Sequence, residues 1–106
     1  MKLSGTNIKM TRGDVESFTV KCSTPFADGD TLTMTVREDA ESDIAFQKVV
    51  TEFDGNGWAV IGIRPGDTSG LEFGDYVYDI QLTRADGTVT TLVTISRFEL
   101  LEEVTY

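Results

Sequence analysis

The sequence predicts an all-β fold, an immunoglobulin-like antiparallel β-sandwich of about seven strands that forms a single domain over residues 1–106. The first observation behind this prediction is apolar alternation. One stretch carries large apolar side chains at every second position, and these are Tyr76, Tyr78, Ile80 and Leu82. The second observation is that turn-forming pairs such as Asp-Gly and Pro-Gly recur at short intervals, which is typical of short strands.

The predicted strands lie between these turns. In chain order they cover residues 8–11, 15–22, 31–37, 45–53, 58–63, 74–83 and 89–101. The third strand is the most regular, because Leu32, Met34 and Val36 alternate with threonines and are expected to face the core. The last two strands flank Asp86-Gly87, a pair that predicts a β-hairpin.

Three segments depart from simple alternation. In the fourth strand the apolar face changes between Phe46 and Phe53, and in the last strand it changes between Val93 and Phe98, so each is expected to contain a bulge or to cross between sheets. The strand at 58–63 is apolar on both faces. Its core side is either Trp58 and Val60, or Ala59, Ile61 and Ile63. The only helix expected is one turn beginning at Asp67, whose carboxylate would cap the exposed amides.

The tyrosines near the start of the sixth strand are the predicted structural site. Tyr76 occupies the position of a tyrosine corner, in which the hydroxyl bonds backward to the main chain and fixes the connection before the strand. The alternative is that Tyr76 and Tyr78 are simply two core aromatics on one face. In both cases the expected core site contains Tyr76, Tyr78, Ile80 and Leu82.

Composition limits the partners and the compartment. Eighteen acidic against nine basic residues give a formal charge of −9, which repels nucleic acids and anionic lipid, so neither nucleic acid nor membrane is an expected partner. The first residues lack the apolar stretch of a secretory signal peptide, which predicts a soluble chain that is not exported by its own leader, and the single cysteine predicts synthesis in a reducing cytoplasm. The one cysteine, Cys22, cannot form a disulfide within the domain and is expected to be a small buried apolar residue.

The residues do not predict catalysis or a cofactor. Histidine is absent, which removes the commonest general base and transition-metal ligand, so the chain is not expected to be an enzyme. The acidic turns at residues 28–30 and 54–57 could offer oxygen to calcium, but neither completes a known loop, and both are interpreted as turns. The Arg12-Gly13-Asp14 tripeptide is likewise interpreted as a turn that opens a strand.

Two acidic features have no assigned role at this point. The densest charge run, residues 38–43, is interpreted as a solvated loop between the third and fourth strands. Asp79 lies within a strand and faces away from the core. It either pairs across strands with a base such as Arg97 or Lys21, or lies in a subunit contact.

The order of short motifs along the chain resembles a known family. The motifs include Met10-Thr11-Arg12-Gly13-Asp14, Gly29-Asp30-Thr31-Leu32, Gly57-Trp58 and Gly74-Asp75-Tyr76-Val77-Tyr78-Asp79-Ile80. Together they resemble small immunoglobulin-like virion proteins of phages and prophages of Gram-positive bacteria, above all the N-terminal domain of the baseplate upper protein family. The sequence ends at Tyr106, whereas larger members continue into helical and receptor-binding parts, and no binding residue can be carried over.

The resemblance implies a non-enzymatic structural component of a phage or prophage particle, in its tail or baseplate or as an accessory virion protein. Such a protein would contact other virion proteins, form a homo-oligomer through edge strands and a sheet face, and reside in the virion after synthesis in the bacterial cytoplasm. One alternative is a carbohydrate-binding or adhesion module of bacterial origin, with Trp58 and either Phe53 or Phe73 as an exposed platform. A second alternative is an accessory or regulatory domain of an enzyme.

Overall fold

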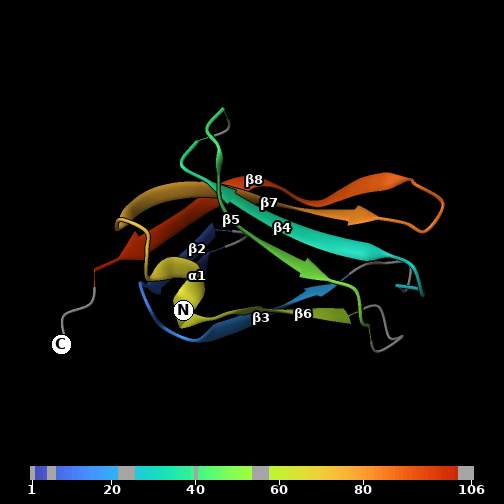
Figure 1. The fold of residues 1–106 in the computed structure, drawn as a ribbon, viewed down its shortest axis with the longest axis horizontal. Coiled ribbons are helices and arrows are strands. Elements are labelled where there is room, and N and C mark those ends of the chain that lie inside the picture. The colour runs from blue at the N-terminus through green and yellow to red at the C-terminus, as the bar shows by residue number, and fades with distance from the viewer. Residues whose placement is uncertain (1, 5–6, 22–25, 40, 54–57, 103–106) are drawn as a thin grey trace.

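The computed structural model describes residues 2–4, 7–21, 26–39, 41–53 and 58–102, which form two β-sheets packed face to face (Figure 1). The elements are β1 (Lys2–Ser4), β2 (Asn7–Thr11), β3 (Glu16–Lys21), β4 (Thr31–Arg37), β5 (Ile44–Val50), β6 (Trp58–Ile63), α1 (Pro65–Thr68), β7 (Gly74–Thr83) and β8 (Val89–Leu101). The predicted all-β sandwich is confirmed. No helix in the described part of the chain is long and apolar enough to cross a membrane.

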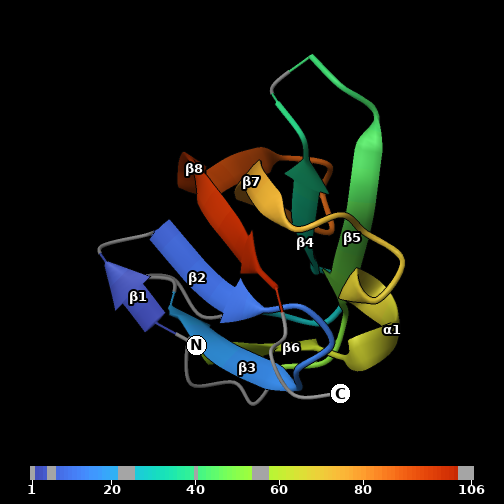
Figure 2. The same ribbon diagram turned by 90° about the vertical axis from the view of Figure 1, so that its left-hand side faces the viewer.

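The two sheets differ in size. The larger has six strands in the order β1-β2-β8-β7-β4-β5, and the smaller contains only β3 and β6. Figure 2 shows the small sheet lying beneath the larger one. The helix α1 lies at the side of the sandwich where β5 and β6 are the edge strands of their sheets. Two features differ from the prediction. The short strand β1 was not expected, and β2 pairs with β8 in parallel rather than antiparallel orientation.

The core lies between the sheets and follows the predicted alternation. In β4, the side chains of Leu32, Met34 and Val36 are fully buried while the intervening residues are half-buried. Its neighbour β7 presents the same pattern, with Tyr76, Tyr78, Ile80 and Leu82 at 5%, 4%, 0% and 1% exposure. Each fully buried aliphatic side chain of this kind stabilises the fold by roughly 1.5–3 kcal/mol.

The structure decides the face of β6 that the sequence left open. Ala59, Ile61 and Ile63 are buried, whereas Val60 points outward and is 61% exposed. The β3–β6 ladder pairs Phe18 with Ile61, so this face of the small sheet closes the core from below. The side chain of Trp58 lies outside the described residues.

The expected changes of face have different origins in β8 and β5. Opposite β7, Ser96 pairs with Tyr78 and Val93 pairs with Ile80, so β8 contains an extra residue between these pairs, and the predicted bulge is confirmed. The ladder of β5 with β4 also contains an irregularity, but it lies at Ala45, between the pairs Val36–Phe46 and Arg37–Ile44. From Phe46 to Val50, where the sequence places the change of face, β5 pairs regularly with β4. The strand ends at Val50, and Phe53 then reaches the core from the following segment.

The helical turn begins two residues earlier than predicted, at Pro65. Asp67 still acts on the exposed amides, because its carboxylate accepts a hydrogen bond from the Arg64 backbone N–H at 2.8 Å. The same carboxylate forms an ion pair with Lys48 of β5 at 3.0 Å. Lys48 shares the inward face of this edge strand with Phe46 and Val50, so the pair ties α1 to the open side of the sandwich.

Candidate binding site at the acidic hairpin

The hairpin between β4 and β5 projects from the outer face of the larger sheet and is the most prominent surface feature of the molecule (Figure 1). Hydrogen bonds within the turn shape its tip. The Arg37 guanidinium donates to the Ser42 carbonyl at 2.7 Å, and the Asp39 carboxylate accepts from the Glu41 N–H at 2.9 Å. The backbone hydrogen bond from Glu41 lowers the pKa of Asp39, which keeps the turn's own carboxylate charged.

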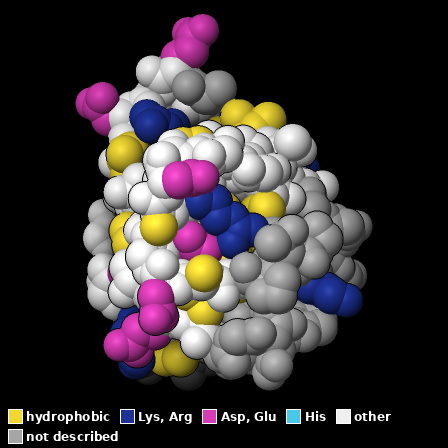
Figure 3. All heavy atoms as spheres, turned by 90° about the vertical axis from the view of Figure 1, so that its right-hand side faces the viewer, with side chains coloured by type: hydrophobic (Ala, Val, Ile, Leu, Met, Phe, Trp, Pro, Cys, Tyr) yellow, Lys and Arg dark blue, Asp and Glu magenta, His cyan; other side chains and the backbone are white. Residues whose placement is uncertain are grey.

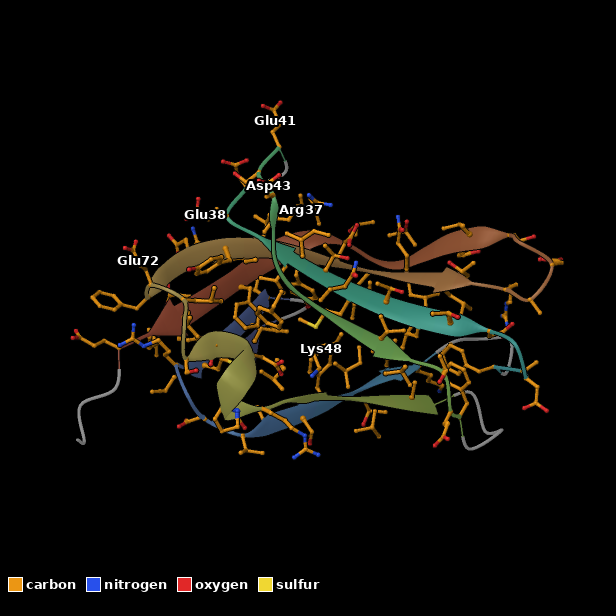
Figure 4. The ribbon with its side chains drawn as sticks, in the orientation of Figure 1. Arg37, Glu38, Glu41, Asp43, Lys48 and Glu72 are labelled. Atoms are coloured by element: carbon orange, nitrogen blue, oxygen red, sulfur yellow. The ribbon has the colours of Figure 1, made fainter. Side chains whose placement is uncertain are left out.

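An open hollow of about 630 Å³ lies between this hairpin and the segment that leads into β7. Its rim contains four exposed carboxylates. Glu38, Glu41 and Asp43 come from the hairpin and Glu72 comes from the opposite wall, as Figure 4 shows. The sequence interpretation of residues 38–43 as a solvated loop agrees with the exposure of its four described carboxylates, Glu38, Asp39, Glu41 and Asp43. It missed the hollow, however, because Glu72 joins the rim only through the tertiary fold.

Less polar groups line the inside of the hollow. They are the side chains of the half-buried Ala45 and Leu71 and the buried Tyr76. Tyr76 links the predicted core site to this hollow, because its hydroxyl donates to the Glu72 carbonyl at 2.6 Å. This backward bond over four residues is the interaction that a tyrosine corner requires.

Two further contacts hold the wall that carries Glu72. The Arg12 guanidinium donates to the Leu71 carbonyl at 3.0 Å and lies 5.8 Å from the centre of the Phe73 ring. Nearby, the Thr68 hydroxyl, which is fully buried, accepts from the Gly13 N–H at 2.9 Å. The Arg12-Gly13-Asp14 tripeptide is therefore a structural turn whose arginine is bound within the protein.

The electrostatic field around the hollow acts on Tyr76. Burial raises the pKa of the Tyr76 phenol, and the charges of Glu38 and Glu72 raise it further, while Arg12 opposes them. The phenol therefore stays protonated at neutral pH and keeps its hydrogen bond to the Glu72 carbonyl. The lining combines four exposed carboxylates with the less exposed side chains of Ala45, Leu71 and Tyr76, which is suited to binding a cationic group with a carbon stem.

The described residues do not bring metal ligands together. Within these ranges no three His, Cys, Asp or Glu side chains are placed to hold one ion. At the turn of residues 28–30, Asp30 is only 3% exposed. Its carboxylate accepts from the Ala27 and Ala85 N–H groups at 2.9 and 3.1 Å and from Arg84 at 2.8 Å. The other calcium candidate, residues 54–57, lies outside the described residues.

The remaining sequence candidates do not gather at one place. Phe53 stacks on Phe26 with ring centres 4.5 Å apart, and Phe73 lies under the guanidinium of Arg12. The two rings therefore do not form one aromatic platform for a sugar. Asp79 is half-buried on the outer face of β7, opposite Thr35 of β4. Cys22 lies outside the described residues.

Comparison with known proteins gives a fold neighbour but no family. No protein-family model matches the chain, and no curated protein matches it. Among solved structures it is similar to CopC from Methylosinus trichosporium OB3b, with a TM-score of 0.57 and 12% sequence identity, covering 94% of this chain and 89% of CopC. At this level of identity the similarity shows a shared β-sandwich fold.

The predicted resemblance to phage virion proteins is wrong. The fold neighbour is CopC, and nothing in the comparisons points to a phage protein. The structural role in a tail or baseplate and the location in a virion are corrected with it. The motifs that carried the resemblance are strand and turn residues that many small β-sandwiches need, so their order reflects the fold and not the source of the protein.

The described residues of this chain do not supply the donor set of a copper site. The sequence contains no histidine, and two of its three methionines, Met10 and Met34, are buried in the core at 2% and 0% exposure. Soft or imidazole ligands are the donors that copper prefers. We therefore assign no copper chemistry to the described residues.

Proposed function

We propose that this chain is a non-enzymatic binding module that recognises a basic segment of a partner protein at the acidic hollow. The observation that carries the proposal is the hollow itself. Four exposed carboxylates, from Glu38, Glu41, Asp43 and Glu72, line it together with the apolar side chains of Ala45 and Leu71 and the ring of Tyr76. Lysine and arginine side chains have the complementary form, a charged head on an apolar stem.

The overall charge supports a basic partner. A formal charge of −9 attracts cationic proteins over the distance at which surface charges act and increases their rate of association. The same charge opposes binding to nucleic acid and to anionic membranes, which we propose are not partners. The separation of the carboxylates favours a segment with several cationic side chains over a single metal ion, because no three of the described carboxylates converge.

Both edge strands of the larger sheet are poorly suited to pairing with a strand of another protein, which favours a partner that binds at the hollow. On the edge strand β5, Lys48 points inward toward Asp67, and an inward charge on an edge strand opposes pairing with another chain. At the other edge, β1 has only three residues. The homo-oligomer expected from the sequence stays a prediction.

Calorimetric titration with a capped tetralysine peptide tests the proposal. Replacing the rim with Glu38→Gln, Glu41→Gln, Asp43→Asn and Glu72→Gln keeps the side-chain shapes and removes four charges. We expect the affinity to fall by at least about tenfold, since each exposed ion pair contributes up to roughly 1 kcal/mol.

A second variant controls for the loss of overall charge. Asp14→Asn, Asp28→Asn, Glu52→Gln and Glu102→Gln removes four exposed carboxylates outside the lining of the hollow. This variant should bind tetralysine within about twofold of the native protein. Equal weakening by the two variants, or no binding by the native protein at low ionic strength, would contradict the proposal.

A further inference from the structure

The acidic hollow continues into two smaller hollows on the outer face of the larger sheet. A hollow of about 370 Å³ shares Glu38 and Tyr76 with the acidic hollow. A third, of about 90 Å³, shares Val77 and Ile95 with the second. Shared lining residues therefore connect the three hollows, from the acidic hollow to the outer face of the larger sheet.

The bulge in β8 places an apolar group in this line. Between the pairs Tyr78–Ser96 and Ile80–Val93, one residue of β7 faces two residues of β8. At this point Ile95 is 58% exposed, and it lines both smaller hollows together with the half-buried Val77. We call Ile95 and Val77 the apolar step. Bulges commonly redirect a side chain in this way beside binding sites.

Charged groups flank the apolar step on the sheet face. Arg97 is the ladder partner of Val77, and Asp79 lies on the other side of the step. The step is therefore a small apolar area within polar surroundings, which is the composition of a contact point for one side chain rather than of a broad interface.

We propose that the partner segment runs in extended form from the acidic hollow to the apolar step, so that it carries an aliphatic residue next to its basic residues. This inference rests on the proposed function, and it adds an aliphatic residue to the basic residues that the partner segment is proposed to carry. Charge complementarity directs the basic side chain to the rim carboxylates. The exposed Ile95 side chain gains from being covered by an aliphatic side chain, because burial removes apolar surface from water.

Two capped peptides of equal charge test the inference by calorimetry, Lys-Leu-Lys-Leu and Lys-Ser-Lys-Ser. The native protein should bind the leucine peptide about fivefold more tightly, the effect of partly burying one aliphatic side chain. Ile95→Ser should remove this preference while leaving the binding of the serine peptide unchanged. Val60→Ser is the matched control, because Val60 is an equally exposed β-branched residue on the small sheet.

The outcomes separate the two proposals. Equal binding of the two peptides, or a leucine preference that survives Ile95→Ser or is lost equally in Val60→Ser, overturns the apolar step and leaves the acidic hollow standing. Binding of neither peptide overturns both proposals. A dimer of the native protein that Ile95→Ser converts to a monomer would assign the step to a second copy and overturn this inference as well.

Discussion

The two ends of β4 use carboxylates in opposite ways. Before Thr31, Asp30 is 3% exposed and accepts hydrogen bonds from two backbone amides and Arg84, which ties the turn at 27–30 to the β7–β8 hairpin. After Arg37, Glu38 begins a group of exposed carboxylates around an open hollow. Figure 3 faces the first end, where basic and acidic side chains lie intermixed. A buried carboxylate with its hydrogen bonds satisfied stabilises the fold, whereas a group of exposed carboxylates is available to a partner.

Removing the buried carboxylate should have the largest effect. Asp30→Ala leaves two backbone amides and the Arg84 guanidinium without their acceptor, and such groups are costly when buried. We expect the unfolding temperature to fall by about 10 °C in a thermal scan followed by circular dichroism. A fall no larger than that of the exposed variant Asp28→Ala would contradict the assigned role of Asp30.

The stability that Asp30 contributes at the start of β4 should depend on pH. The backbone hydrogen bond from Ala27, together with Arg84, lowers the pKa of Asp30 in the folded state relative to its ordinary value of 3.8. Because the folded pKa is the lower one, the stabilisation is complete above 3.8 and is lost as the pH falls below that value. Stability measured from neutral pH to pH 2 should therefore decline more steeply in this window for the native protein than for Asp30→Asn. Parallel curves would argue against this linkage.

The tyrosine corner connects the fold to the acidic end and should have an intermediate effect. Tyr76→Phe retains the buried ring but loses the 2.6 Å bond to the Glu72 carbonyl. We expect a loss of about 1 kcal/mol in the free energy of unfolding measured with urea. An unchanged urea midpoint would show that the bond contributes nothing to stability.

Neutralising the rim should have the smallest effect on stability. Carboxylates exposed around a hollow repel one another, so the variant with Glu38, Glu41, Asp43 and Glu72 replaced by their amides should unfold within about 2 °C of the native protein. A slight rise at low salt is the expected direction, because the repulsion is screened when salt is added. A large destabilisation would mean that the rim serves the fold, and the contrast between the two ends of β4 would disappear.

Much of the fold was predictable because alternation is a local property. β4, β6, β7 and β8 have the predicted bounds. In contrast, β1 contains a single apolar residue, Leu3, and its pairing with β2 depends on the assembled sheet. The helical turn was predicted two residues late, because Pro65-Gly66 was interpreted as a turn and not as the first helical residues.

The candidate site was predictable only in part. The charge run at 38–43 is visible in the sequence, and the exposure of its described carboxylates was predicted correctly. Its meeting with Glu72 depends on the β4–β7 ladder, in which Arg37 pairs with Val77, and no local pattern specifies that register. The phage assignment failed for a related reason, since turn and strand motifs report the fold and not the function.

The most direct test is a map of amide chemical-shift changes in the isotopically labelled native protein during titration with tetralysine. The account predicts changes at residues 38–43 and around Glu72 and Tyr76, with the turn at 27–30 and the β7–β8 hairpin unaffected. Changes spread evenly over exposed carboxylates at both ends of β4, or confined to the Asp30 end, would contradict it.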